Sequence, residues 1–153
     1  GGVKMIISKQ GDLLQDEADA LVNAVNCVGV MGKGIARQFK ETFPAMYLSY
    51  EQACRNHEVV PGKMHVYRMG SGRPKFIINF PTKRHWEDDS FMEDIDRGLV
   101  DLVRVVKELG IQSIAIPPLG CGLGGLDWAD VRPRIVQAFE PLPDVAVHLY
   151  EPL

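Results

Sequence analysis

Two glycine-rich loops are the part of this sequence best suited to chemistry. Residues 29–34 read GVMGKG and residues 120–125 read GCGLGG, and each loop follows a short apolar run and precedes a helical stretch. Glycine allows positive φ and close backbone approach, and N–H groups in such loops and at helix N-termini attract anions. Neither loop contains the GxxxxGK[ST] motif. The two loops together therefore predict a diphosphate site with no metal requirement.

Polar side chains flank these loops. Asn23 and Asn26 lie at the end of an apolar strand pattern, and Asp12 follows a glycine after the first strand. Asparagine suits ribose hydroxyls because it offers donors and an acceptor without charge. Asp12 could accept a hydrogen bond from an exocyclic amine such as that of adenine. The alternatives stay open: the asparagines could be turn formers, and Asp12 could cap a helix or a turn.

The three cysteines, Cys27, Cys54 and Cys121, are widely spaced and form no CxxC pair. This pattern indicates a reducing compartment and argues against a structural zinc site. Cys121 lies in the second glycine loop and could act as a nucleophile, but no histidine lies close to it in sequence. The alternative is a small side chain tolerated in a crowded loop.

Composition bounds the class of protein. With 153 residues, 46% hydrophobic and 24% charged, the chain is expected to form a single soluble domain, residues 1–153, in the cytoplasm. No apolar run reaches the roughly 18 residues that span a membrane, and no signal peptide is visible. Gly1 and Gly2 are expected to be a cloning remnant, and whether the domain is excised from a longer protein stays open. A net charge of −3 argues against nucleic-acid binding over the whole surface but allows a local basic patch.

The positioning elements can be read from hydrophobic periodicity. We expect strands at 4–8, 20–25, 64–69, 75–80, 113–116 and 145–150, and helices at 35–43, 45–56, 88–109 and 128–139. In the long helix, apolar residues from Phe91 to Val106 recur every three or four positions, and Gly110 is expected to end it. Alternating strands and helices predict an α/β domain with a mixed, largely parallel sheet and helices on both faces.

The ordered motifs GDL (residues 11–13), VNAVN (22–26), GVMGKGIA (29–36) and PLGCGLGGL (118–126) resemble those of macrodomains over essentially the whole chain. The resemblance implies a three-layer α/β/α sandwich that binds ADP-ribose. It implies that Asp12 binds the adenine amine near Tyr150, that the two loops wrap the diphosphate and distal ribose, and that Asn23 and Asn26 lie near that ribose. The full implied set is Asp12, Leu13, Asn23, Asn26, Met31, Gly32, Lys33, Gly34, Ile35, Pro118, Leu119, Gly120, Cys121, Gly122, Leu123, Gly124 and Tyr150.

Within macrodomains, MGKGIA and the FPTK segment at 80–83 are similar to the ADP-ribosyl glycohydrolases, and most to the DarG family of antitoxins that act on ADP-ribosylated thymidine in DNA. This resemblance implies that Lys83 is the catalytic residue. A related protein glycohydrolase carries an aspartate at the position of Gly124, and Asp127 is three residues too far along to replace it simply.

Two roles are open for Lys83. Attack on the anomeric carbon requires a neutral amine, favoured by burial or by a cation such as Arg84. Protonation or electrostatic stabilisation of the leaving base requires the charged form. The alternative is a solvated surface lysine.

The segment around Lys83 also suits single-stranded nucleic acid, with Thr82, Arg84, His85 and Trp86 as candidate DNA contacts. Arg73 and Lys75 would extend this patch if the hairpin tip lies nearby. The alternative is a charged loop with a packing tryptophan.

The resemblance thus implies a hydrolase of ADP-ribosylated single-stranded DNA that uses no cofactor or metal and is paired with a DNA ADP-ribosyltransferase toxin. Two other functions stay open: hydrolysis of ADP-ribosyl-glutamate or -aspartate in proteins or of O-acetyl-ADP-ribose, and binding of ADP-ribose without turnover.

Overall fold

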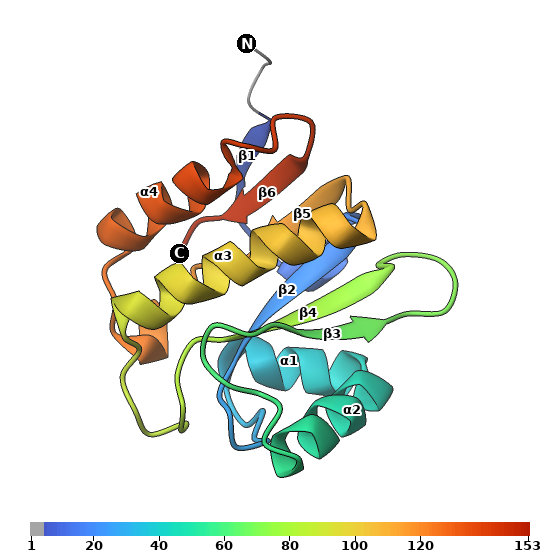
Figure 1. Cartoon of the computed structure of the whole chain (residues 1–153), viewed down its shortest axis with the longest axis vertical. Helices are drawn as coiled ribbons and strands as arrows, with labels where there is room; N and C mark the ends of the chain where they lie inside the picture. Colours follow the sequence, from blue (N-terminus) through green and yellow to red (C-terminus); the bar gives the residue numbers. More distant parts are fainter. Residues whose placement is uncertain (1–4) are drawn as a thin grey trace.

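A six-stranded sheet forms the centre of the computed structural model, which describes residues 5–153 (Figure 1). The strand order is β1-β6-β5-β2-β4-β3, and only the β3–β4 pair is antiparallel. The strands are β1 (Ile6–Lys9), β2 (Ala20–Val25), β3 (His65–Arg68), β4 (Phe76–Pro81), β5 (Ser113–Ile116) and β6 (Ala146–Tyr150). The predicted mixed, largely parallel sheet is confirmed. The expected cloning remnant and the start of the first expected strand at residue 4 lie outside the described residues.

Helices cover both faces of the sheet. Successive strand residues point to opposite sides, so the apolar strands place side chains on both faces, and each face is buried under two helices. The helices are α1 (Gly34–Thr42), α2 (Pro44–Arg55), α3 (Met92–Leu109) and α4 (Trp128–Phe139). On β2, Leu21 packs in one core with α1 and α2, whereas Val22 packs in the other with α3 and α4. The two cores and the sheet between them make the three-layer α/β/α sandwich (Figure 1).

The beginning of α3 differs from the sequence prediction. The helix starts at Met92 rather than at residue 88, although it ends as expected before Gly110, which has φ +62°. The backbone N–H of Asp88 donates to His85 and that of Ser90 donates to Gly124, so these residues are held in a loop. Phe91, expected on the apolar helix face, is 54% exposed.

Close packing of α3 fixes the end of β4. A Cβ atom at Gly98 would lie 2.2 Å from Cζ of the buried Phe80 ring, so only glycine lets the helix approach this closely. Phe80 stands three residues before Lys83. The helix therefore helps to place the segment that carries the candidate catalytic lysine.

Two short 3-10 turns, Leu13–Gln15 and Gly122–Gly124, were not anticipated. Within residues 5–153, no helix has the length and apolar character needed to cross a membrane.

Candidate active site

Three segments that follow parallel strands meet at one edge of the sheet. Thr82, after β4, donates its N–H to Val25 at the end of β2 (2.8 Å), and Cys27 donates to the carbonyl of Arg84 (2.9 Å). Ser90 donates to Gly124 in the glycine loop after β5 (2.9 Å). The structure thus joins the Lys83 segment to both glycine-loop regions, at the edge where α/β sheets bind ligands.

Asn26 organises the turn that leads into the first glycine loop. Its Nδ2 donates to the carbonyl of Val30 (2.8 Å), and its Oδ1 accepts from the N–H of Val28 (3.0 Å) and from the Tyr50 hydroxyl (2.9 Å). Burial raises the pKa of Tyr50, which keeps this hydroxyl a donor. Both ends of the Asn26 amide are therefore used inside the protein, and its predicted contact with a ribose stays a prediction.

Asn23 lies in the interior rather than on the surface. It is 0% exposed, its Nδ2 donates to Oδ1 of Asn79 (3.1 Å), and it lies next to the sulfur of Met31. Asn79, which the sequence analysis missed, in turn contacts Nδ1 of His65 (3.0 Å). Asn23 and Asn79 occupy paired positions on the neighbouring strands β2 and β4. An asparagine in each of two otherwise apolar strand patterns was the signal in the sequence that could have indicated this contact.

The first glycine loop ends at the start of α1. Lys33 is the N-cap residue and makes no side-chain cap hydrogen bond within the described chain, and Gly34 has φ +58°. Gly32, Lys33 and Gly34 are exposed, Ile35 is partly buried and Met31 is buried. The start of α1 is therefore exposed, and binding of a phosphate there stays a prediction.

The second glycine loop turns through Gly120, Gly122 and Gly125, whose φ values are +75°, +68° and +80°. Leu119 and Gly120 are buried, Pro118 and Cys121 are partly buried, and Leu123 is exposed. Burial, with the nearby charge of Asp127, raises the pKa of the Cys121 thiol, which argues against a nucleophilic cysteine.

Asp127 has a structural task of its own. Its carboxylate accepts a hydrogen bond from the N–H of Ala129 (3.0 Å) and so caps α4. A carboxylate held in this cap is less suited to the role of a carboxylate at position 124.

Lys83 is partly buried and donates from Nζ to the carbonyl of Trp86 (3.1 Å). Trp86 is 49% exposed, and its ring lies 4.9 Å from the His85 ring, centroid to centroid. Arg84 is half exposed and pairs with Asp94 (2.8 Å), whereas Thr82 is buried. Of the four candidate DNA contacts, the structure therefore leaves three side chains accessible and encloses that of Thr82.

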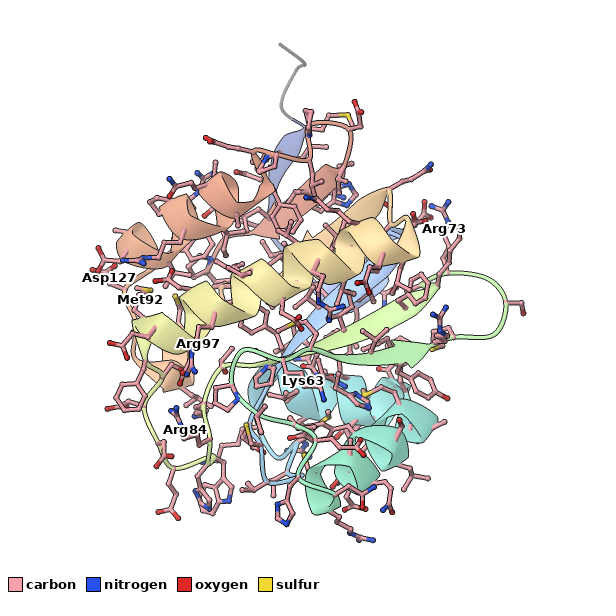
Figure 2. All side chains as sticks on the ribbon, in the orientation of Figure 1. Lys63, Arg73, Arg84, Met92, Arg97 and Asp127 are labelled. Carbon is pink, nitrogen blue, oxygen red and sulfur yellow. The ribbon has the colours of Figure 1, made fainter. Side chains whose placement is uncertain are left out.

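Arg73 and Lys75 do not extend this patch. Both pair with Asp19, which precedes β2, at 3.5 and 3.9 Å, whereas Lys83 and Arg84 follow β4 at the opposite edge of the sheet. In Figure 2, Arg73 lies at the right of the molecule and Arg84 at the lower left. The condition for the extension, a hairpin tip close to Lys83, is not met, because the length of β4 separates the tip from the Lys83 segment.

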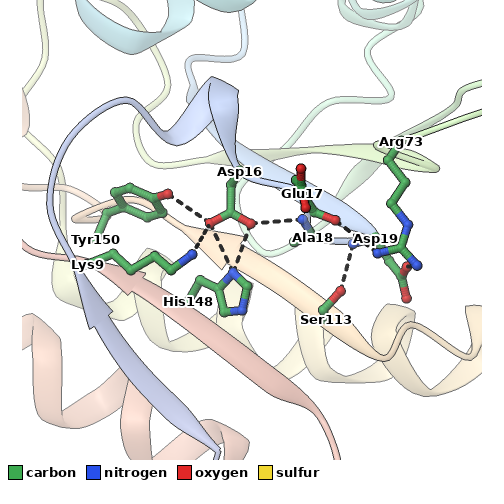
Figure 3. A network of polar contacts seen from close by, with 9 residues as sticks. All are labelled: Lys9, Asp16, Glu17, Ala18, Asp19, Arg73, Ser113, His148 and Tyr150. Atoms are coloured by element: carbon green, nitrogen blue, oxygen red, sulfur yellow. Dashed lines mark hydrogen bonds and ion pairs between the residues drawn. The ribbon is translucent and has the colours of Figure 1, made fainter.

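The predicted adenine end carries a buried polar network (Figure 3). Tyr150 donates to Oδ2 of Asp16 (2.8 Å), and Nδ1 of His148 lies 2.8 Å from Oδ1, which also accepts from the N–H of Ala18 (2.8 Å). Asp12 is exposed and caps the turn Leu13–Gln15 by accepting a hydrogen bond from the N–H of Leu14, which agrees with the alternative that it is a cap. Leu13 is buried. Asp16 and His148 were missed because their link joins segments 132 residues apart.

Within the described chain, no group of three or more histidine, cysteine or acidic side chains is placed to hold a metal ion.

Comparison with known proteins gives consistent matches. The family model described as Macro domain matches residues 22–135. A DNA ADP-ribosyl glycohydrolase of Mycobacterium tuberculosis is 57% identical over 97% of this chain and 42% of its own length. A DNA ADP-ribosyl transferase-DNA ADP-ribosyl glycohydrolase fusion protein of Thermosipho africanus is 37% identical over 94% of this chain and 41% of its own length. The chain therefore spans about two-fifths of these relatives.

Solved structures of macrodomain proteins match the fold of this chain. The macrodomain of Mycobacterium tuberculosis DarG superposes with a TM-score of 0.96 at 56% identity, covering 98% of this chain and 99% of that one. Thermosipho africanus DarTG in complex with ADP-ribose gives a TM-score of 0.91 at 36% identity, covering 100% of this chain and 44% of that one.

Proposed function

This chain belongs to the macrodomain family, and we propose that it is an ADP-ribosyl glycohydrolase that removes ADP-ribose from thymidine bases in single-stranded DNA. The observation that carries the proposal is the place of Lys83. Its segment is hydrogen-bonded to the Asn26 turn on one side and to the second glycine loop on the other. The segment that carries Lys83 is thus held between two loops suited to the diphosphate.

The reaction needs few protein groups. The glycosidic bond between the anomeric carbon of the distal ribose and the base breaks, water supplies the new C–O bond, and the base leaves with a proton. Lys83 either donates that proton or stabilises the charge that develops on the base, or it attacks the anomeric carbon before water releases it. Lys83 Nζ donates to the carbonyl of Trp86, a contact that both the charged and the neutral amine can make.

Accessible rings beside Lys83 support a nucleic-acid substrate. Trp86 and His85 offer stacking faces, and Arg84 keeps its guanidinium half exposed while it pairs with Asp94. Stacking on aromatic rings favours unpaired bases, because paired bases already stack on their neighbours. The fusion relative supports a DNA ADP-ribosyltransferase toxin as the cellular partner.

We also propose that residues 1–153 act as one domain in the cytoplasm. A single sheet is shared by both cores. The three cysteines are all free thiols, which fits a reducing compartment.

The test is release of ADP-ribose from a thymidine-ADP-ribosylated single-stranded oligonucleotide. We expect turnover by the wild type and a loss of about 10²- to 10⁴-fold in Lys83→Ala, the usual size of an acid–base contribution. Lys107→Ala is the matched control, because this exposed lysine lies in the last turn of α3, at the opposite edge of the sheet. Undiminished release by Lys83→Ala would contradict the assignment of Lys83.

Two further arms separate the rival functions. Release only from an ADP-ribosylated glutamyl protein or from O-acetyl-ADP-ribose would assign the alternative substrates, and ADP-ribose binding without release from any substrate would assign a reader. Lys83→Arg separates the two roles of the lysine, since arginine keeps the charge but not a neutral amine. Substantial turnover in Lys83→Arg supports the electrostatic role.

A further inference from the structure

Ser90 presents a buried hydroxyl to the second glycine loop. The residue is 5% exposed, and its backbone N–H is fixed by the carbonyl of Gly124 (2.9 Å). Measured from the position that a Cβ atom would take on Gly124, Ser90 Oγ lies at 2.4 Å, Ser90 Cβ at 3.1 Å and Ser90 N at 3.9 Å. The side chain therefore points from its own backbone toward the space that a side chain on Gly124 would occupy.

This contact explains the glycine at position 124. Gly120, Gly122 and Gly125 all have positive φ, but Gly124 does not, so its backbone conformation is open to any residue. The obstacle to a side chain there is Ser90, because a new Cβ would lie 2.4 Å from its Oγ and 3.1 Å from its Cβ, so the serine side chain would have to move. The absence of a side chain at position 124 thus leaves space for the Ser90 hydroxyl.

The hydroxyl nevertheless has no hydrogen-bond partner among residues 5–153. A buried polar group without a partner destabilises the folded protein. An alanine at position 90 would pack against Gly124 without that cost. A hydroxyl kept in such a place calls for a partner that is not part of the protein.

We propose that Ser90 is a ligand-contacting residue of this site, whose Oγ hydrogen-bonds a hydroxyl group that enters beside the second glycine loop. The inference rests on the proposed function. A neutral hydroxyl is the matching chemistry, because Ser90 can both donate and accept and carries no charge. Two sources supply it in the reaction, a hydroxyl of the distal ribose and the water that hydrolyses the bond.

Position supports this assignment as well. Ser90 lies in the loop that carries Lys83, and its backbone contact with Gly124 joins that loop to the second glycine loop. The only other buried side-chain oxygen or nitrogen without a partner in the described chain is Oδ1 of Asn23, in the middle of β2. Ser90 is therefore the buried unpaired group that faces the junction of the two loops.

The experiment compares Ser90→Ala with Ser113→Ala, a part-buried serine that accepts a hydrogen bond from the N–H of Asp19 at the opposite edge (2.8 Å). The readouts are thermal unfolding, the affinity for ADP-ribose by calorimetry, and release from the ADP-ribosylated oligonucleotide. We expect Ser90→Ala to be at least as stable as the wild type and to lose roughly tenfold in affinity or in kcat, the size of one hydrogen bond. Ser113→Ala should lose stability and keep both activities.

The outcomes separate the two sources. Weaker ADP-ribose binding indicates the ribose hydroxyl, whereas unchanged binding with a lower kcat indicates the water. Unchanged affinity and kcat in Ser90→Ala, or a loss of stability as large as that of Ser113→Ala, would overturn the proposal. Should the wild type release no ADP-ribose, the proposed function fails, and the affinity measurement alone then decides whether Ser90 contacts the ligand.

A double substitution checks the geometry. Gly124→Ala should disturb the loop and weaken ADP-ribose binding, because the new methyl group meets Ser90 Oγ. Adding Ser90→Gly to Gly124→Ala removes that collision and should restore stability but not the contribution of the hydroxyl. Equal stability of the single and the double variant would show that Ser90 does not determine the glycine.

Discussion

Asp94 Oδ2 accepts a hydrogen bond from Arg84 Nη1 over 2.8 Å, and this ion pair ties the first turn of α3 to the residue next to Lys83. Asp94 is 1% exposed and also pairs with Arg97 on its own helix. Arg84 in turn holds Cys27 through its backbone carbonyl (2.9 Å). A buried carboxylate thus fixes the loop that presents the candidate catalytic lysine.

Asp94→Asn should therefore affect turnover more than ligand binding. The neutral amide keeps the shape but loses the charge that orients Arg84, and we expect kcat to fall while the Kd for ADP-ribose stays within about twofold. Both arginines remain half exposed, so the cost in unfolding free energy should stay below that of a fully buried pair, at about 1–3 kcal/mol. Urea denaturation and oligonucleotide turnover measure the two effects.

Asp96→Asn is the matched control, two residues along the same helix. Asp96 pairs with Arg134 at 2.5 Å, and both side chains are nearly half exposed. Such surface pairs contribute about 0–1 kcal/mol, so this variant should keep its turnover. Equal loss of kcat in both variants would contradict a positioning role for Asp94.

Asn26→Ala should loosen the first glycine loop. The substitution removes the contacts of Nδ2 with Val30 and of Oδ1 with Val28 and Tyr50. Tyr50 can still donate to the main-chain carbonyl of residue 26 (2.8 Å), so at about 1 kcal/mol for each hydrogen bond lost we expect a loss of stability of about 2–3 kcal/mol. ADP-ribose binding should weaken because the loop is no longer held in place. Denaturation and calorimetry measure both.

Asn56→Ala is the control for this prediction. Asn56 is exposed, and its side chain accepts only from Gln52 among the residues described (3.3 Å), so we expect a change of about 0.5 kcal/mol or less. Unaltered ADP-ribose affinity in Asn26→Ala would show that the loop forms without this amide.

The sequence predicts best where one local pattern decides the structure. The bounds of β2 (Ala20–Val25) and α4 (Trp128–Phe139) were correct, because apolar β-branched runs and capped amphipathic stretches carry their own signal. The macrodomain resemblance added the fold and the choice of Lys83. The predicted roles of the loop residues toward ADP-ribose stay predictions.

Contacts between segments far apart in the chain limit what can be predicted from the sequence. The predicted beginning of α3 was wrong. Its apolar period assigns residues 88–91 to the helix, but a hydrogen bond from Ser90 to Gly124, 34 positions along the chain, holds them in a loop. The link between Asp16 and His148 and the spatial reason for Gly124 depend in the same way on tertiary packing. No local pattern reports on such contacts, since each residue taken alone has an ordinary alternative.

Tyr150→Phe should reveal how Asp16 depends on pH. Burial raises the pKa of Asp16, but hydrogen bonds from Tyr150, His148 and Ala18 together lower it by more than burial raises it. The net pKa of Asp16 therefore lies below 3.8. A carboxylate with a lowered pKa in the folded state stabilises it above its unfolded pKa, and this stability is lost as the pH falls through the folded value. The variant should lose about 1–2 kcal/mol at pH 7, and the deficit should shrink below pH 3.8.

Denaturation curves between pH 7 and pH 3 measure this difference. Tyr67→Phe is the control, because the Tyr67 hydroxyl makes no hydrogen bond with any residue from 5 to 153 and the change should be small at every pH. A deficit in Tyr150→Phe that is constant with pH would show that the Asp16 carboxylate is not its source.

Trp86→Ala should separate recognition of DNA from recognition of ADP-ribose. Trp86 is 49% exposed, so part of its ring can stack on a base, whereas the contact with Lys83 uses the backbone carbonyl, which alanine retains. Stacking contributes about 1–3 kcal/mol per base, so KM for the ADP-ribosylated oligonucleotide should rise about tenfold. The Kd for free ADP-ribose should stay unchanged, because that ligand brings no DNA base next to the ring.

Leu48→Ala provides the comparison, since Leu48 is a 64% exposed apolar residue on α2, outside the loops that form the site. It should leave KM for the oligonucleotide unchanged. If Trp86→Ala weakens free ADP-ribose as much as the oligonucleotide, the ring acts on the ADP-ribose site itself. If it changes neither, DNA does not stack on Trp86. Only a selective rise in KM for the oligonucleotide supports a stacking surface beside Lys83.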